Sequence, residues 1–545
     1  MIRPLLSYDD SRDLIKQDRL GAYFRMAPET ATLAGYHGYD HLLGHADREH
    51  VEEELRFLTE WLEDLRRLPS KTLTPEQRLD LLLFERGHAM LRFVFETMQL
   101  WDRNPDAISE VGQILFMMLL YAAEDETQRF TDIAERLEQL PRFVREHQSR
   151  TRTPPRRWRD LAVQTTAAMP PFFDALAAAA EAQVAGSLAE RIRQGGARAK
   201  TITAEYLAWL KTLPVDDAES WILGPERFAE LLRLRDLGLS PEEILALGQD
   251  YLTRYRAEQR ELAIAITGSP DVDAARRRVE ADAPRDFAAA LAATRAACTE
   301  ARAFLTERRL VPLPATEQLT IIETPDFLRP LIPFAAIFPP ARFDPAQRGI
   351  YIVTPPADAA DLARHCNYAG LYNTAVHEAY PGHHLQLSTA NQSASIMRSS
   401  PVVGGKATEL VEGWAHYCEE LMKTHGFHDS PAERFMMVSD LVWRATRIII
   451  DVRLSQGHMS YDEAVAMLVE NARMPEAGAR AEVNRYTHSP GYQLSYLVGK
   501  HQLLALKEAV KAKEGRAFSE FAFHERLLES GSIPIGIIRR EIFRV

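Results

Sequence analysis

Residues 372–386 are Tyr372-Asn373-Thr374-Ala375-Val376-His377-Glu378-Ala379-Tyr380-Pro381-Gly382-His383-His384-Leu385-Gln386. Three of the chain's 17 histidines fall within eight residues here, and a glutamate directly follows the first of them. Imidazole and carboxylate groups are the ligands that zinc takes from proteins. A hydrolase that works at neutral pH also needs a carboxylate near the metal to handle the protons of a water molecule. The stretch therefore predicts a metal centre.

His377 and Glu378 begin like the signature H-E-x-x-H, but Pro381 stands where that signature has its second histidine. Each residue of a helix turns about 100°, so His384 would share the face of His377 and His383 would not. Pro381 and Gly382 should break the helix and swing one of the two histidines back toward the metal. Which of them returns stays open. The other would hold a carboxylate near the metal or bind substrate.

A second stretch, residues 409–420, has the pattern of a helix and supplies more carboxylates. We predict Glu412 as the third metal ligand, drawn from a later helix that packs on the first. Gly413 beside it would let another backbone come close. Glu419 and Glu420 are alternatives for the ligand, although both are more typical of the solvated end of a helix.

The sequence His-Glu-Ala-Tyr-Pro-Gly-His-His-Leu-Gln, followed by Glu-Gly-Trp-Ala, resembles the bacterial "domain of unknown function 885" family. That family is grouped with zincin-type, gluzincin-like metallopeptidases. The resemblance extends over nearly the whole chain, with further landmarks at residues 30–35, 224–232 and 489–496. In the last of these the family more often has Pro-Gly-Gln where this chain has Pro-Gly-Tyr-Gln. The resemblance implies a mostly helical, peptidase-like fold and leaves the substrate open.

The length of 545 residues is enough for two lobes with large cores. Residues 1–310 show helical patterns almost throughout and are predicted to form a helical N-terminal lobe. Residues 311–545 would form the catalytic lobe. Two β-branched runs, 318–323 and 349–354, predict a small sheet just before residue 377, as either a substrate-binding edge or a structural hairpin. The predicted fold class is mainly α, a two-lobed metallopeptidase-like fold with a small β-sheet beside the metal-binding helices.

The composition disfavours several classes of protein. The net charge of −12, without a run of lysine and arginine, disfavours a nucleic-acid partner. The three cysteines lie far apart and form neither a disulfide framework nor a Cys-x-x-Cys metal site. Residues 1–10 lack the apolar core of a signal peptide, and no stretch approaches the roughly 20 apolar residues of a membrane span. We therefore expect a cytoplasmic protein without a membrane partner. A homodimer is compatible with this sequence.

Residues 485–500 combine three tyrosines and a histidine around a Pro-Gly break. Hydroxyl and N–H groups can stabilise the oxyanion of peptide hydrolysis. Tyr496 and Tyr492 are the first catalytic candidates, with His488 and Tyr486 behind them, the last also as a substrate contact. An aromatic packing stripe is the alternative. Arg485 or Lys500 would bind a substrate carboxylate if the enzyme trims chain ends.

Together these residues predict a zinc metallopeptidase with one Zn²⁺ per chain. His377, Glu412 and His383 or His384 would hold the metal, which lowers the pKa of water toward about 7. Glu378 would take the water's proton and pass it to the leaving amine of a peptide or small amide. The alternative is a non-catalytic helical binding protein with a structural His/Glu metal cluster. A carboxylate-bridged iron or manganese protein would need repeated Glu-x-x-His pairs, which the sequence does not offer convincingly.

Overall fold

The structure is a computed structural model, and it describes residues 19–69, 71, 73–121, 125–324, 329, 332, 335–399 and 407–545. Residues 1–10, on which the expected absence of a signal segment depends, lie outside the described residues. Within the described ranges, no helix combines the length and apolar character that crossing a membrane requires. The chain is mainly helical with one small sheet, as predicted.

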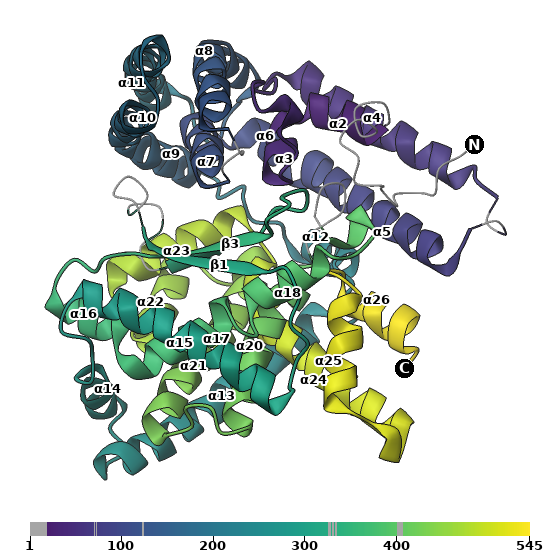
Figure 1. The fold of residues 1–545 in the computed structure, drawn as a ribbon, viewed down its shortest axis with the longest axis vertical. Coiled ribbons are helices and arrows are strands. Elements are labelled where there is room, and N and C mark those ends of the chain that lie inside the picture. The colour runs from purple at the N-terminus through teal and green to yellow at the C-terminus, as the bar shows by residue number, and fades with distance from the viewer. Residues whose placement is uncertain are drawn as a thin grey trace.

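The first layer of the molecule contains the helices of residues 19–212, drawn in purple to blue in the upper part of Figure 1. Its elements are α2 (Arg19–Met26), α3 (Pro28–Leu33), η1 (His37–Tyr39), α4 (Arg48–Arg66), α5 (Pro75–Arg92), the π-helix η3 (Phe93–Met98), α6 (Leu100–Arg103), α7 (Ala107–Leu120), α8 (Glu126–Arg150), α9 (Arg156–Ala168), α10 (Pro170–Gln183) and α11 (Ser187–Thr212). Thr74 and Gln77 form a full capping box at the start of α5.

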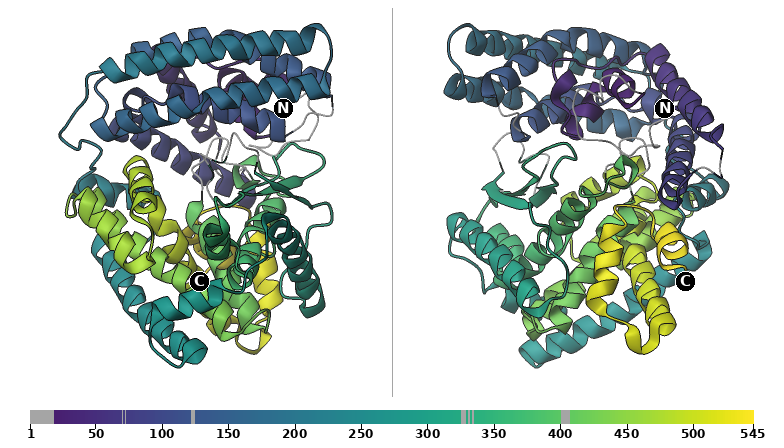
Figure 2. Two further views of the ribbon diagram at one scale, coloured as in Figure 1. Left: turned by 90° about the vertical axis from the view of Figure 1, so that its left-hand side faces the viewer. Right: turned by 45° about the vertical axis from the view of Figure 1, so that its right-hand side comes forward.

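The larger body below contains the remaining elements, and both views of Figure 2 show it under the first layer. They are α12 (Pro225–Leu234), α13 (Pro241–Thr267), α14 (Val272–Glu280), α15 (Phe287–Arg308), β1 (Gln318–Glu323), β2 (Ala335–Phe338), β3 (Arg348–Val353), α16 (Ala359–Cys366), α17 (Tyr368–Glu378), α18 (His383–Ala390), α19 (Ile396–Ser399), α20 (Thr408–Thr424), α21 (Pro431–Ser455), α22 (Tyr461–Ala472), α23 (Glu476–His488), η5 (Tyr492–Leu494), α24 (Ser495–Glu514), η6 (Gly515–Ala517), α25 (Glu520–Glu529), α26 (Ile535–Ile537) and the π-helix η7 (Ile538–Phe543).

Helices from before residue 310 also contribute to this lower body. α13 packs along α21, and α15 packs against α17, the helix that carries His377. Each contact joins a segment of the predicted N-terminal lobe to one of the predicted catalytic lobe. The division at residue 310 stays a prediction about folding units.

The small sheet lies between the two groups of helices and has the strand order β1-β3-β2. β1 pairs parallel to β3, whereas β2 pairs antiparallel to it, so the two predicted strands do not form a hairpin with each other. Ile350 and Ile352 of β3 pack into the core formed by α7–α11. Tyr351 and Val353 point the other way, into the core around α15 and α17. The central strand is therefore buried on both faces and joins the two cores.

Helices α20 and α24 cross at a pair of glycines. A Cβ atom on Gly413 would lie 2.4 Å from the carbonyl carbon of Gly499, and one on Gly499 would lie 2.0 Å from the backbone oxygen of Glu409. No side chain fits at either position, so the two backbones are in direct contact. This confirms the close approach predicted beside Glu412 and fixes α20 against the helix that carries Tyr496.

Candidate metal centre

The helical break predicted at Pro381 and Gly382 lies between two helices. α17 ends at Glu378, and α18 begins at His383. The backbone N–H of Gly382 donates to the carbonyl of Val376 at 3.0 Å. A Cβ atom on Gly382 would lie 1.8 Å from the backbone oxygen of His377, so only glycine can make this turn. The break reverses the chain tightly enough to bring a histidine of α18 back beside α17.

The histidine that returns to the side of His377 is His383. His377, His383 and Glu412 together are called the cluster below. Its Nε2 lies 3.4 Å from Oε2 of Glu412 on α20, and Nε2 of His377 lies 3.8 Å from the same oxygen. The three candidate ligand atoms all lie within 4.8 Å of one another. All three side chains are at most 11% exposed. Two imidazoles and one carboxylate, from three helices, thus converge on one buried point.

His384 points away from this point. Its Nε2 lies 2.8 Å from Oε2 of Glu317, and the hydroxyl of Tyr380 donates to the same oxygen at 2.6 Å. The other oxygen of Glu317, Oε1, accepts a hydrogen bond from Nε of Arg302 at 2.9 Å. A Cβ atom on Gly349 of β3 would lie 2.3 Å from Nδ1 of His384, so the ring packs directly against the sheet. His384 therefore holds a carboxylate and joins α18 to β3 and α15.

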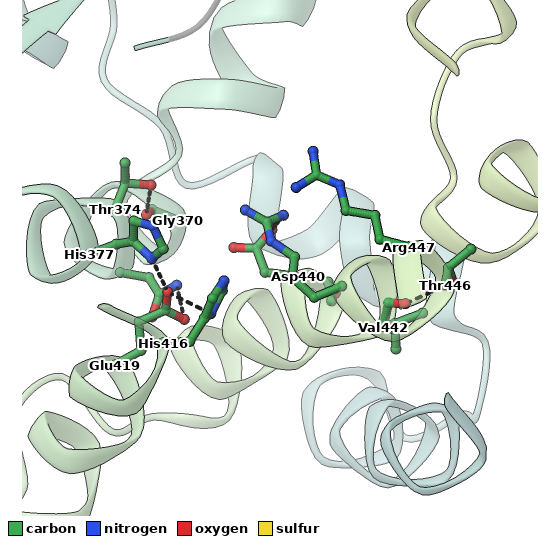
Figure 3. Close-up of polar contacts among 12 residues, drawn as sticks. Gly370, Thr374, His377, His416, Glu419, Asp440, Val442, Thr446 and Arg447 are labelled. Atoms are coloured by element: carbon green, nitrogen blue, oxygen red, sulfur yellow. Dashed lines mark hydrogen bonds and ion pairs between the residues drawn. The ribbon is translucent and has the colours of Figure 1, made fainter. Parts of the chain in front are cut away.

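Glu419 lies directly behind His377. Its Oε1 accepts a hydrogen bond from Nδ1 of His377 at 2.6 Å, and its Oε2 accepts one from the amide of Asn373 at 3.0 Å. Figure 3 shows His377 and His416 both directed at this carboxylate. Its side chain is 2% exposed, so our interpretation of Glu419 as part of a solvated helix end is wrong. Metal-binding histidines commonly donate their second ring N–H to such a carboxylate.

His416 is a buried polar residue that the sequence analysis missed. It is 1% exposed, and its ring centroid lies 4.8 Å from that of His377 and 5.8 Å from that of Tyr496. Its Nδ1 lies 3.1 Å from Oε1 of Glu419 without hydrogen-bond geometry. Residues 412, 416 and 419 are spaced to share one helix face. That spacing was the available signal for both His416 and Glu419.

The charges of the cluster complement one another. Burial lowers the pKa of His377, but the carboxylates of Glu412 and Glu419 more than offset this and hold that pKa well above its usual value. Burial likewise raises the pKa of Glu412, yet His377 and His383 hold it well below its usual value. The buried carboxylates therefore favour a positive charge between these side chains.

Glu378 is the last residue of α17 and is partly buried. Its negative charge affects two neighbouring side chains besides His377. Burial is the main cause that raises the pKa of Cys298 to about 12, and the charge of Glu378 is the second cause. Burial and then the charge of Glu378 also raise the pKa of Tyr351. The carboxylate thus lies on the side of α17 that faces α15 and β3. Glu378 makes no hydrogen bond within the described part of the chain, which leaves its oxygens available.

Tyr492 is bound to the cluster through Glu412. Its hydroxyl donates to Oε1 of Glu412 at 2.8 Å. The turn that carries it is fixed by Asp451, which is 1% exposed and accepts the backbone N–H groups of Gly491 and Gln493, each at 2.9 Å. The Tyr496 ring lies edge-on to Tyr492, with centroids 5.9 Å apart. Both first-choice tyrosines therefore lie beside the cluster.

The other predicted residues of this region have partners elsewhere. His488 stacks on Trp158 of α9 with ring centroids 4.5 Å apart, and its Nδ1 lies 3.1 Å from the backbone oxygen of Asn484. The structure does not bring His488 to the cluster. Lys500 is 1% exposed, and its Nζ lies 2.6 Å from Glu420, which explains the position of that second glutamate as well.

Tyr486 and Arg485 belong to a separate ionic group around Glu482. This carboxylate accepts hydrogen bonds from Tyr486 at 2.8 Å, from Arg485 at 2.9 Å and from Arg447 at 2.5 Å. Burial raises the pKa of Glu482, but Arg447 and Arg485 outweigh it and lower that pKa to about 2. The group holds α21 and α23 together.

A cavity of about 270 Å³ lies between the first layer and the lower body. Tyr492, His488 and Glu409 form part of its wall. Most of the remaining lining is apolar and comes from α5, η3 and α12, including Leu83, Met90, Val94, Met98, Leu231 and Leu234. The cavity therefore offers an apolar space next to the tyrosine that holds Glu412.

The residues present fit a zinc ion. Two imidazole nitrogens and one carboxylate oxygen match a His₂Glu donor set, which leaves room for a fourth ligand in catalytic zinc sites. The carboxylate behind His377 and the tyrosine on Glu412 are the supporting hydrogen bonds that such ligands require. Buried charged groups in proteins are paired with one another or coordinate metals, and these three donors converge on one point.

Comparisons with known proteins give a family and a fold. The family model described as "Bacterial protein of unknown function (DUF885)" matches residues 28–542. No curated protein matches the chain. A solved structure titled as a "putative lipoprotein of unknown function" from Shewanella oneidensis is 21% identical, with a TM-score of 0.77 over 97% of this chain and 99% of that one. One titled as a "putative lipoprotein" from Colwellia psychrerythraea is 19% identical, with a TM-score of 0.79 over 98% of each chain.

Proposed function

This chain belongs to the bacterial DUF885 family, and from that premise we propose that it is a zinc-dependent peptidase. The observation that carries the proposal is the convergence of His377, His383 and Glu412 from three helices, with Glu419 behind the first histidine. The family is described as being of unknown function, and so is the similar protein from Shewanella oneidensis. The proposal therefore rests on the residues of this chain.

In this proposal His377, His383 and Glu412 hold one zinc ion. Zinc in such a site supplies a Lewis acid and makes a water molecule nucleophilic at neutral pH. Glu378 would accept a proton from a water molecule and pass it to the leaving amine. Glu378 directly follows His377 and has no hydrogen-bond partner among the described residues, and both facts support this role.

The two tyrosines have different roles. The hydroxyl of Tyr492 is committed to Glu412, so Tyr492 positions that carboxylate. Tyr496 lies beside His416 and Tyr492 and is the residue we assign to the oxyanion of the tetrahedral intermediate. The apolar cavity beside Tyr492 would accept an apolar side chain of a peptide substrate. The cytoplasmic location, the peptide substrate and any homodimer remain parts of the prediction.

The test is the variant Glu378→Gln, assayed for bound zinc and for cleavage of a mixed peptide library. We expect about one zinc per chain in both proteins and a loss of cleavage of roughly 10²- to 10⁴-fold in the variant. Glu470→Gln, which makes the same change at an exposed position of α22, is the control and should cleave normally. Full cleavage by Glu378→Gln would contradict its role. Wild-type protein that binds no zinc would contradict the proposed activity.

A further inference from the structure

Arg444 of α21 has unsatisfied hydrogen-bond donors close to the candidate metal centre. Its Nε and Nη1 are both buried, and neither has a hydrogen-bond partner among the described residues. Its ion-pair partner, Oδ1 of Asp440, lies 3.8 Å away, which is too far for a hydrogen bond. A guanidinium carries five N–H donors and is always charged, so leaving buried donors unused is costly. The group is therefore prepared for an anion from outside the described chain.

Aromatic rings fix the direction of this guanidinium. Its Cζ lies 4.1 Å from the ring centre of Trp443 and 5.3 Å from that of Tyr496. Tyr496 in turn contacts His416, which contacts His377. Arg444 is thus joined to the metal-ligand helix by an unbroken series of neighbouring rings. Stacked arginines lose little freedom when they bind a carboxylate, because the planar fork is already oriented.

The neighbouring arginines, Arg447 and Arg485, have hydrogen-bond partners for their buried donors. Arg447 donates to Glu482 and to the hydroxyl of Tyr486 at 2.9 Å. Arg485 also donates to Glu482. Both guanidinium groups therefore have good hydrogen bonds to protein acceptors. Of these three arginines, Arg444 alone has buried donors without a partner in the described structure.

Asp440 shows that water reaches the neighbourhood of Arg444. Its Oδ1 lies 3.8 Å from Nη1 of Arg444, and 41% of its side-chain surface is accessible, whereas the Arg444 side chain is 14% exposed. A small solute can therefore approach the guanidinium along Asp440. Asp440 lies on α21, which packs against α17, the helix that carries His377, and Figure 3 labels both residues.

We propose that Arg444 binds a carboxylate of the substrate, and that this carboxylate is the free C-terminus of a short peptide. The proposal rests on the peptidase function proposed above and adds a substrate class to it. An extended peptide spans about 3.4 Å per residue, so the rings between Arg444 and His377 would separate the carboxylate from the scissile bond by only a few residues. The enzyme would therefore release short fragments from C-termini.

The experiment measures binding, so that it does not depend on turnover. Zinc-loaded Glu378→Gln protein is titrated by calorimetry with acetyl-trialanine as the free acid and as its C-terminal amide. A second pair of peptides, both amidated, compares acetyl-Ala-Asp-Ala with acetyl-Ala-Asn-Ala. Each titration is repeated with Arg444→Gln added, and with Arg453→Gln as the matched control, since Arg453 lies on the same helix and bonds to the backbone oxygen of His458.

We expect the free acid to bind roughly 10- to 100-fold more tightly than the amide, as a charge-assisted bidentate contact allows. Arg444→Gln should bring this ratio close to one, and Arg453→Gln should keep it. If Arg444→Gln does not fold, Arg444→Lys, which keeps the charge without the fork, should give an intermediate ratio. An unchanged ratio in a folded Arg444 variant overturns the proposal. The proposal is also overturned if the protein prefers the Asp peptide to the Asn peptide but does not prefer the free acid to the amide. That result would show that Arg444 binds a side-chain carboxylate and not the C-terminus. If the protein still prefers the free acid but the wild type cleaves no peptide, the peptidase function alone is rejected.

Discussion

Glu419 accepts a hydrogen bond at 2.6 Å from Nδ1 of His377, while Nε2 of the same ring faces Glu412 and His383. The carboxylate therefore fixes both the orientation of the imidazole and the ring nitrogen that is free to bind a cation. Because Glu419 is anchored by Asn373, this relationship links α20 to α17 at a proposed metal ligand.

The first prediction concerns this pair. Glu419→Gln should weaken zinc affinity by roughly 10- to 100-fold, because a supporting carboxylate is lost although all three proposed ligands remain. Competition with a chelating dye measures the affinity. Glu470→Gln controls for the loss of one negative charge and should bind zinc normally. Unchanged affinity in Glu419→Gln would show that the carboxylate has no part in metal binding.

The adjacent histidines give a second prediction. His383→Ala should lose zinc, whereas His384→Ala should retain about one zinc per chain, since His384 is bonded to Glu317. We expect His384→Ala to lower the free energy of unfolding by about 1–3 kcal/mol, because Glu317 loses one of its partners while buried. Elemental analysis and urea denaturation measure the two effects. Zinc loss in His384→Ala, with zinc kept in His383→Ala, would reverse the assignment.

A third prediction separates the tyrosines. Tyr496→Phe should lower kcat by roughly 10²- to 10³-fold without loss of zinc, because it removes an oxyanion donor. Tyr492→Phe should weaken zinc binding by about tenfold, because Glu412 loses a hydrogen bond. Each variant serves as the control for the other. Equal effects of both on zinc binding would contradict the division of roles.

The pH dependence of stability gives a fourth prediction, at Glu482. Its pKa falls from an ordinary value of 4.5 to about 2 in the folded protein. The folded state therefore binds fewer protons, so the stability from this group is complete above about pH 4.5 and is lost as the pH falls toward 2. The gap in unfolding free energy between wild type and Glu482→Gln should shrink by roughly 3 kcal/mol over that range. Urea titrations at several pH values measure it, with Glu470→Gln as control. A gap that does not vary with pH would contradict the assignment.

Much of the fold could be predicted because the signals are local. The break at Pro381 and both long strands depend on neighbouring residues. The pairing of the strands could not be predicted, because β3 lies between β1 and β2 only as a result of the long-range packing of its two faces. Short β2 has no strong local signal of its own.

The candidate site could be predicted in part for a related reason. His377 and Glu412 follow from motifs, and the structure brings both together with His383. Glu317 could not be found from sequence, because its contact with His384 depends on how the sheet meets α18. The role of Arg444 could not be predicted either, because the packing of α21 decides whether its donors have partners.

The contact between Gly413 and Gly499 has a consequence for protein engineering. Since the two backbones touch there, the spacing between α20, which carries Glu412, and α24, which carries Tyr496, does not depend on the size of any side chain. Residues of the surrounding core could then be exchanged for others of different volume while that spacing persists. The main chain alone sets the distance between the two crossing helices. A designer could therefore move this helix pair as a unit into another helical scaffold.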